Sequence, residues 1–408
     1  MPELRAAEEG AAPHDHHRIL AVLLALVGPA GAQGLRHVFR TAPALVGLPG
    51  LAASGPYQNA ADMILEQAIR NLPLYPAASS AYTFRWDETQ GSLVRADDTV
   101  SAWPYTERGQ TLGEGLLNIG VTWGYFDVDS VNGHDLGHDP FPVSVCCGSK
   151  IRYQALTDLL YTVTTFNITY GLLDDLDLNI AIPIVTLDMD MDVTRQDLAR
   201  GPIRRATADQ NAGNISDMLL RAKYRLFETS GDLGSAVGAG GVRVRLPSGN
   251  ARQGLGTGYG EIGPYVALTT SLVGGWLDSD WDAGVDAGIG NLRWSSAHYS
   301  WELDFHAPRG EDWWSRLALM TSVLGRSEFT SLRQATSISG PHVTPAGRFS
   351  EPYLGLDANR NTYIDATFGV RVEVWRSVAV SLGVFKALNS VGVRPDGWSP
   401  VGTIEGTF

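Results

Sequence analysis

From residue 115 to the end of the chain, apolar and polar residues alternate in a series of segments. In residues 117–125 the apolar side chains Leu117, Ile119, Val121, Trp123 and Tyr125 share one face. Alternation with a period of two is typical of a β-strand with two unlike faces. The pattern predicts twelve strands, near residues 117–125, 165–170, 176–189, 218–226, 242–246, 260–272, 281–293, 298–306, 313–324, 364–374, 378–384 and 400–408.

The connections between these segments alternate between short and long. Short polar turns lie at residues 172–175, 228–232, 274–280, 308–312 and 375–377, and most of the others are longer. Only the connection near residues 294–297 breaks the rule. Short turns at one rim and long loops at the other are typical of an outer-membrane barrel, with the short turns in the periplasm. The favoured fold is therefore an all-β, transmembrane, antiparallel up-and-down β-barrel, although a soluble β-sandwich would alternate too.

Residues 33–114 lack most of this alternation and are predicted to form an N-terminal segment, a candidate plug for the barrel at 115–408. Residues 59–71 favour one short helix, which Pro73 would end. Residues 81–96 read as a hairpin around an Asp-Glu-Thr-Gln-Gly turn. If this hairpin joins the wall, the barrel would have fourteen strands instead of twelve.

One predicted strand changes phase. In residues 176–189 the apolar positions are even up to Ile184 and odd from Leu187 onward. Such a change is expected where one extra residue enters a strand, so the pattern predicts a β-bulge or kink near Pro183–Thr186. A kinked wall could open a lateral gap, or the strand could leave the bilayer at this point, which is the favoured interpretation.

Composition agrees with a membrane barrel. Charged residues make up 18% of the 408 residues, below the usual quarter of soluble domains. No stretch of 18 consecutive apolar residues exists that could form an ordinary transmembrane helix. The net charge of −13 argues against a nucleic-acid partner, because phosphate binding requires clustered Lys and Arg.

The N-terminus resembles an export signal. The apolar run of residues 19–27 follows two histidines and Arg18, and Ala30-Gly31-Ala32 matches a small-x-small cleavage site. These features predict a signal peptide over residues 1–32, and hence a protein that leaves the cytoplasm for the bacterial outer membrane.

The two cysteines, Cys146 and Cys147, are adjacent in the sequence. They are predicted to lie in a loop, where a possible disulfide between them would stiffen the chain. No Cys-x-x-Cys spacing supports a metal site or exchange chemistry, and the sequence predicts no cofactor.

Charged residues occupy the polar face of several predicted strands, where they would line the lumen. Such charges pair with one another or form a polar path for a solute. These candidate lumen residues are Arg221, Lys223, Arg225, Arg243, Arg245, Arg371, Asp177, Asp365 and Glu373.

Aromatic residues are placed as in a membrane barrel. Trp276, Trp281, Trp313, Trp314 and Trp375 lie in or beside the short turns, where an interfacial aromatic girdle would sit. Phe408 ends the last alternating segment, as the terminal aromatic does in the closing strand of bacterial outer-membrane barrels, and is read as an assembly signal.

One pair of residues resembles part of a known catalytic site. His298 and Ser300 match the His-x-Ser pair of outer-membrane phospholipases, but Trp301-Glu302 follows where that family has Asn-Gly. The alternation turns both side chains toward the lumen, whereas a lipase acting on membrane lipid needs them at the lipid surface. The sequence therefore predicts no enzyme.

Several short motifs, in order and spacing, resemble a family of outer-membrane barrels. The motifs are Tyr82–Asp87 (YTFRWD), Gly113–Val121 (GEGLLNIGV), Tyr170–Leu178 (YGLLDDLDL), Leu220–Tyr224 (LRAKY), Arg245–Gly249 (RLPSG), Leu255–Gly258 (LGTG), Phe385–Asn389 (FKALN) and Gly397–Pro400 (GWSP). The family is loosely related to long-chain fatty-acid transporters and to barrels of MetA-type phenol-degradation pathways. The chain lacks the Asn-Pro-Ala plug motif of the fatty-acid transporters.

The resemblance implies an outer-membrane channel for passive uptake of small hydrophobic or aromatic compounds. It also implies three kinds of partner: outer-membrane lipid with lipopolysaccharide, the barrel-assembly machinery and a small hydrophobic solute. Two alternatives stay open at this point. One is a non-transporting barrel that binds a partner through its long loops, and the other is a general porin.

Overall fold

The structure is a computed structural model, and a defined part of the chain is described. The described residues are 36–49, 55–78, 84–87, 92–95, 104–137, 141–144, 151–197, 203–231, 234–272, 276–290, 292–306, 317–329, 342–344, 347–349, 362–375 and 378–408. The predicted signal peptide and the pair Cys146 and Cys147 lie outside these residues.

Twelve antiparallel strands form one closed barrel. In chain order the strands are β3 (Leu117–Asp127), β7 (Ile151–Leu173), β8 (Leu176–Asp197), β10 (Met218–Gly231), β11 (Gly234–Leu246), β12 (Glu261–Leu272), β13 (Leu277–Gly288), β14 (Ser296–His306), β15 (Leu317–Glu328), β18 (Thr362–Trp375), β19 (Val378–Ala387) and β21 (Ser399–Thr407). Pairing of β21 with β3 and of β7 with both β3 and β8 closes the ring. The predicted up-and-down barrel of twelve strands is confirmed.

The hairpin near residues 81–96 does not join the wall. Its strands, β1 (Phe84–Asp87) and β2 (Ser92–Arg95), pair only with each other in a separate sheet. The wall therefore has twelve strands and not fourteen.

The loops carry small elements. A three-stranded sheet joins β4 (Ser130–Val131), β5 (His134–Asp135) and β20 (Val393–Arg394), and β16 (His342–Thr344) pairs with β17 (Gly347–Phe349). Two short 3₁₀ helices are η1 (Ala251–Gln253) and η3 (Leu292–Trp294).

Two α-helices precede the barrel, α2 (Arg36–Leu45) and α4 (Gly55–Asn71). Helix α4 contains the helix predicted for residues 59–71 and begins four residues earlier. The helix ends at Asn71, before Pro73, because proline restricts the preceding residue and cannot donate a backbone hydrogen bond. Neither α-helix is long and apolar enough to cross a membrane.

The barrel is apolar outside and polar inside. Large side chains such as Val266, Leu319 and Leu382 are 59%, 52% and 66% exposed on the outer surface. Inward-facing residues of the same wall, such as Thr122 and Thr269, are polar and buried. Soluble proteins do not expose an apolar surface of this extent, whereas lipid-facing strands require it. The fold is thus that of a bacterial outer-membrane barrel, which excludes the soluble sandwich.

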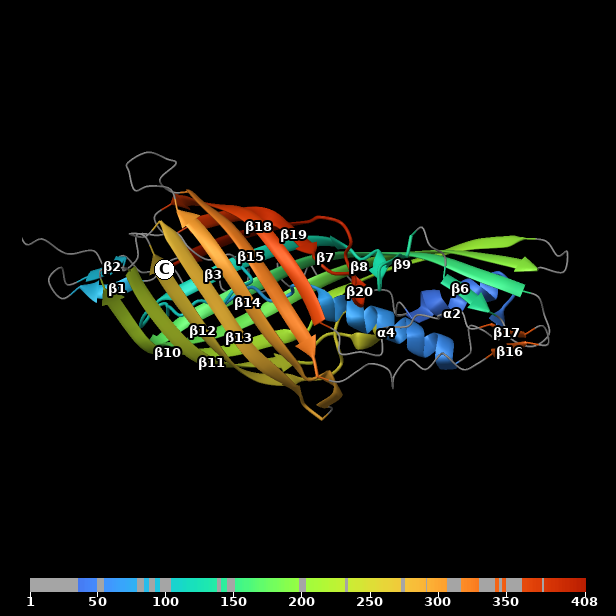
Figure 1. Cartoon of the computed structure of the whole chain (residues 1–408), viewed down its shortest axis with the longest axis horizontal. Coiled ribbons are helices and arrows are strands. Elements are labelled where there is room, and N and C mark those ends of the chain that lie inside the picture. The colour runs from blue at the N-terminus through green and yellow to red at the C-terminus, as the bar shows by residue number, and fades with distance from the viewer. Residues whose placement is uncertain are drawn as a thin grey trace, which may run out of the picture.

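The end of the chain closes the wall at one rim. Phe408 and Leu117 exchange both backbone hydrogen bonds, at 2.8 and 2.9 Å. The C-terminus lies at the same end of the molecule as β1 and β2, and α2 lies at the opposite end (Figure 1). This is the rim of the short turns, such as the one between β10 and β11.

Two of the predicted girdle tryptophans lie on the outer surface. Trp276 and Trp281 are exposed, and the Trp281 ring stacks on that of Trp301 with centroids 5.2 Å apart. Trp313 and Trp314, as well as the side chain of Trp375, fall outside the described part.

Strands β7 and β8 continue far beyond the barrel at the long-loop end (Figure 1). They carry β6 (Phe141–Ser144) on one edge and β9 (Arg204–Ile215) on the other, so that four strands form an extension of the wall. Helix α2 packs against β8 and β9, and also against α4. The extension and the helices share one hydrophobic core, which includes Leu65 and Leu187.

The phase change in β8 has a different cause from the predicted bulge. The pairing of β8 with β7 runs through Pro183–Thr186 without a register shift. The same odd-numbered face stays buried throughout, first as Asp177 and Asn179 and then as Leu187 and Met189. What changes is the surroundings: inside the barrel this face meets a polar lumen, and beyond it the same face packs in the apolar core. The prediction of a bulge within β8 was wrong, and the alternative of a strand leaving the bilayer agrees with the structure.

An extra residue does occur, but on the neighbouring strand. Between the pairs Ala181–Leu219 and Ile184–Ile215, two residues of β8 face three residues of the chain that joins β9 to β10. Pro183 has no backbone N–H for the ladder at this level, while its carbonyl accepts a bond from Ser216 N at 2.8 Å. The bulge therefore forms opposite the proline.

Candidate functional site

Two described stretches between α4 and β3, residues 72–78 and 104–112, run along the inner wall of the barrel. Side chains at alternate positions of β7 donate to the backbone of the first stretch, since every second residue of a strand faces the lumen. The bonds are Thr165 Oγ1 to Leu74 O at 2.7 Å, Asn167 Nδ2 to Ala77 O at 3.0 Å and Thr169 Oγ1 to Ala78 O at 2.8 Å. Residues 72–78 are thus fastened to the lumen side of one strand.

Residues 104–112 form a second stretch inside the lumen, held by other strands. Glu107 N donates to Asp282 of β13 at 3.1 Å, and Gly109 N donates to Thr269 of β12 at 3.0 Å. A Cβ on Gly109 would lie only 2.0 Å from the backbone oxygen of Val237, so the close approach to the wall requires glycine. The two stretches also contact each other, because Ala78 N donates to Glu107 Oε1 at 2.8 Å.

Arg221 of β10 joins the wall to both stretches. Its Nη1 lies 2.5 Å from Glu107 Oε1, its Nε donates to Asn179 at 2.9 Å, and its Nη2 donates to Pro76 O. Burial alone would raise the pKa of Glu107, but the charges of Arg221 and Lys223 outweigh burial and hold that pKa below its usual value. Glu107 is therefore a carboxylate at neutral pH.

The candidate lumen residues lie inside the barrel, most of them in ion pairs. The pairs are Arg221–Glu107, Lys223–Asp177, Arg225–Asp175, Arg243–Asp286, Arg245–Glu261, Arg371–Glu405 and Asp365–Arg394. Arg225 sits at the short-turn rim and is partly exposed, and Glu373 is half-buried. Ion pairs thus occupy most of these charges, and a part in solute passage stays a prediction.

Apart from Lys223–Asp177, each of these pairs has one member that the sequence analysis does not name. Two of the unnamed partners, Glu261 and Asp286, lie on β12 and β13, and Asp278, Asp280 and Asp282 alternate along β13 as lumen residues do. That alternation was available as a signal. Arg70 and Glu107 belong to the N-terminal segment, and no periodicity marks them.

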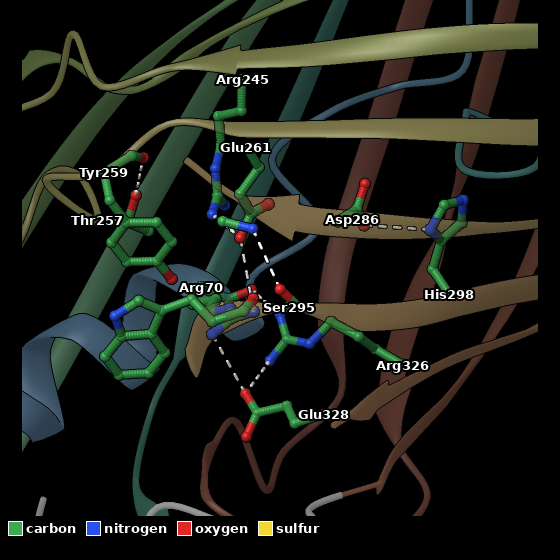
Figure 2. A network of polar contacts seen from close by, with 12 residues as sticks. Arg70, Arg245, Thr257, Tyr259, Glu261, Asp286, Ser295, His298, Arg326 and Glu328 are labelled. Atoms are coloured by element: carbon green, nitrogen blue, oxygen red, sulfur yellow. Dashed lines mark hydrogen bonds and ion pairs between the residues drawn. The ribbon is translucent and has the colours of Figure 1, made fainter. Parts of the chain in front are cut away.

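Five charged side chains form a chain at the C-terminal end of α4 (Figure 2). Arg70 lies 3.5 Å from Glu261 of β12 and 3.5 Å from Glu328 of β15. Glu261 also pairs with Arg245 at 2.5 Å, and Glu328 lies 3.7 Å from Arg326. The order is Arg245–Glu261–Arg70–Glu328–Arg326, with a guanidinium at each end.

Two stacked rings lie against this chain of charges. Tyr259 and Trp294 stack with centroids 5.3 Å apart, and the guanidinium of Arg70 lies 5.2 Å from the Trp294 ring. Arg70 Nη2 also donates to Trp294 O at 2.5 Å. The arrangement combines ion pairing with cation–π attraction and fixes the end of α4 to the wall.

A cavity of about 220 Å³ lies between the N-terminal segment and the wall. Its lining includes Arg245 and Arg326 together with apolar and aromatic groups such as Leu72 and Tyr105. A smaller cavity of about 140 Å³ adjoins it around Leu72 and Pro73. These spaces are small compared with the water-filled lumen of a general porin.

His298 and Ser300 line the larger cavity, as predicted from the alternation. His298 Nδ1 lies 3.1 Å from Asp286, and Ser300 donates to Asp282. Both side chains are part of the lumen polar network and face away from lipid.

Among the described residues, three carboxylates come close enough to share a metal ion. Asp280, Glu302 and Asp304 lie on β13 and β14 with ligand oxygens within 4.8 Å of one another, all buried. Arg108 of the N-terminal segment lies 3.6 Å from Asp280. A guanidinium of the protein therefore already supplies positive charge to this group.

A family model described as "Putative MetA-pathway of phenol degradation" matches residues 127–374. This stretch includes nine of the twelve barrel strands, from β7 to β18. It leaves out the last two strands and all of β3 except Asp127. No curated protein matches the sequence significantly.

Several solved structures of outer-membrane proteins are similar at low identity. An outer membrane channel from Pseudomonas putida F1 has 12% identity and a TM-score of 0.48, with 73% of this chain and 97% of that chain covered. LpxR from Salmonella typhimurium has 11% identity and a TM-score of 0.34, covering 72% and 100%. OccK11 (OpdR) from Pseudomonas aeruginosa has 10% identity and a TM-score of 0.28, covering 74% and 99%. Because all three TM-scores are below 0.5, the assignment of the fold rests on the strand pairing itself.

Proposed function

We propose a function for this chain from the premise that it belongs to the family described as the putative MetA-pathway of phenol degradation. The protein is an outer-membrane channel for the passive uptake of small hydrophobic or aromatic compounds, and its N-terminal segment is the plug. The plug comprises residues 72–78 and 104–112, which lie in the lumen.

The observation that carries this proposal is the attachment of the segment to opposite parts of the wall. Bonds from β7, β10, β12 and β13 hold it, so that it fills much of the lumen and leaves small cavities. A small cavity admits a compact solute and excludes a large hydrated one. The occupied lumen therefore favours a selective channel over a general porin.

The lining of the larger cavity supports an aromatic or partly apolar solute. Leucines and tyrosines such as Leu74, Tyr105 and Tyr299 lie beside charged groups in the same space. Ligand sites of this kind combine apolar walls with a few oriented polar groups. The cavity is thus suited to a ring compound with one polar substituent.

Transport assays on the full chain test the proposal. Proteoliposomes containing the protein should take up small ring compounds such as phenol analogues faster than protein-free vesicles, and exclude sugars of two or more rings. Reconstituted protein that admits neither class would count against a channel. Equal passage of both classes would indicate a general porin instead.

A non-transporting barrel that binds a partner through its long loops is the second candidate. The four-stranded extension projects from the long-loop end and offers such a partner a surface (Figure 1). The same vesicle assay separates the two functions, because vesicles that contain a loop-binding barrel would take up solutes no faster than protein-free vesicles.

A further inference from the structure

The series of charged side chains Arg245–Glu261–Arg70–Glu328–Arg326 contains three guanidinium groups and two carboxylates. Its contacts are all ion pairs, with N–O distances from 2.5 to 3.7 Å. These five side chains together therefore carry one net positive charge, and the side chain at each end of the series is cationic. In a low-dielectric interior an excess charge of this kind attracts an anion more strongly than it would in water.

The cationic ends are also incompletely hydrogen-bonded. Within the described part of the protein, Arg245 Nε and Arg326 Nε find no hydrogen-bond acceptor, and both atoms are buried. Arg70 Nη1 has the carboxylate of Glu328 at 3.5 Å but no hydrogen bond in that same part. Buried donors nearly always have a partner, so the guanidinium groups of Arg245 and Arg326 retain donor capacity for acceptor oxygens.

All three arginines line the 220 Å³ cavity. The nearby pairs Arg221–Glu107 and Arg243–Asp286 also line it and are each balanced within themselves. The carboxylate of Asp282 on β13 lines the cavity as well and accepts hydrogen bonds from Glu107 N and Ser300. The excess positive charge in the chain of five thus belongs to the side of the cavity formed by α4, β11 and β15.

The rest of the lining would suit an aromatic ring. Leu72, Leu74 and Leu324 contribute apolar surface, and Tyr75, Tyr105 and Tyr299 contribute aromatic rings. A cavity of about 150 Å³ accepts benzene, so a space of 220 Å³ has room for one ring and a small substituent.

We propose that this cavity is a binding station for the anion of a single-ring aromatic acid, whose carboxylate takes the donors of Arg245 and Arg326 while its ring lies against the leucines and tyrosines. The inference rests on the proposed function and narrows its solute class from aromatic compounds in general to aromatic monoanions. Guanidinium groups suit this role because their planar donors match a carboxylate.

Equilibrium dialysis of the detergent-solubilised full chain tests the site with labelled benzoate. Benzamide, which has the same shape without the charge, is the matched probe, and benzylamine reverses the charge. The proposal expects saturable binding of benzoate, with benzamide at least about tenfold weaker, as loss of a charged hydrogen bond implies. Equal binding of benzoate and benzamide, or preferred binding of benzylamine, would overturn it.

Variants locate the binding. R326Q and R245Q should each weaken benzoate binding by about tenfold or more. The control is R371Q, because Arg371 is also buried in the lumen in an ion pair, with Glu405, but does not line this cavity. Heat-modifiable gel mobility establishes that each variant is folded. If R245Q does not fold, R326Q alone tests the site. An equal loss in R371Q would overturn the site.

The binding and transport assays separate this inference from the proposed function. Vesicles that admit neutral ring compounds, together with protein that does not bind benzoate, would refute the anion site and leave the channel standing. Saturable binding of benzoate in a barrel that admits no solute would support the site and refute the channel.

Discussion

Glu107 and Arg221, which are 114 residues apart in the sequence, form a buried ion pair with 2.5 Å between Oε1 and Nη1. One residue belongs to the N-terminal segment and the other to β10, so the pair ties the lumen contents to the wall.

The first prediction concerns the pair itself. Replacing Arg221 by Gln leaves the carboxylate of Glu107 buried without its main partner, which typically costs about 3–5 kcal/mol. We expect the N-terminal segment to detach more often, so that single-channel conductance rises and protease cuts the segment faster.

The control for that experiment is Arg225→Gln. Arg225 pairs with Asp175 at the partly exposed rim, where an ion pair contributes about 0–1 kcal/mol. The double variant E107Q/R221Q removes both charges and should recover part of the loss. Wild-type conductance in Arg221→Gln would show that the pair does not hold the segment.

The second prediction is a dependence on pH. The pKa of Glu107 in the folded protein lies below its ordinary value of 4.5, so the pair with Arg221 is fully present above that value and is lost as the pH falls through the lowered pKa. Conductance should therefore increase in acid, at pH values below 4.5. In Glu107→Gln this increase should shrink, and an unchanged acid response would point to other carboxylates.

The third prediction concerns the extension beyond the barrel. Leu187 is fully buried, and its Cδ2 and that of Leu65 both lie near Gly254, within 3.4 Å of the position of an added Cβ. Leu187→Ala should destabilise the packing of β8 against α4 by about 2–5 kcal/mol. Hydrogen exchange of the extension should speed up accordingly. Asp188→Ala, at the neighbouring exposed position, is the control and should have little effect.

The fourth prediction locates the lipid. Val266 lies near the middle of β12 on the outer surface, and an arginine there should cost about 2–4 kcal/mol if it sits at the bilayer midplane. Folding into lipid vesicles, followed by gel mobility, measures the loss. Asp190→Arg, on the outer face of β8 beyond the barrel, should fold like the wild type. Equal losses in both variants would place the bilayer elsewhere.

The fifth prediction concerns Phe408. Its backbone bonds to Leu117 do not depend on its side chain, which is exposed. If the exposed ring is the assembly signal, Phe408→Ala should lower the amount of protein assembled in the outer membrane although the backbone bonds remain. Phe408→Tyr keeps an aromatic ring and should not lower that amount. Equal assembly of the two variants would mean that the ring is not read as a signal.

The sequence predicted the wall well because alternation is a local property. Each strand such as β3 shows its two faces within a dozen residues, and the lengths of the connections order the strands up and down. The change at Pro183 was visible too, but its cause was not. An inner face that becomes apolar looks the same in sequence as an inserted residue, and only the packing of α2 against β8 and β9 distinguishes the two.

The sequence by itself determined the barrel and a set of inward charges such as Arg221 and Arg245, since a period of two fixes which side chains share a face. The tertiary structure decided that the wall has twelve strands and not fourteen. Only the tertiary structure decided which charges meet. Partners such as Arg70 and Glu328 are far apart in the sequence, and their contact depends on the closure of the wall and on the path of the N-terminal segment through it. No local pattern encodes that path, because it is set by the summed contacts of the segment with several distant strands.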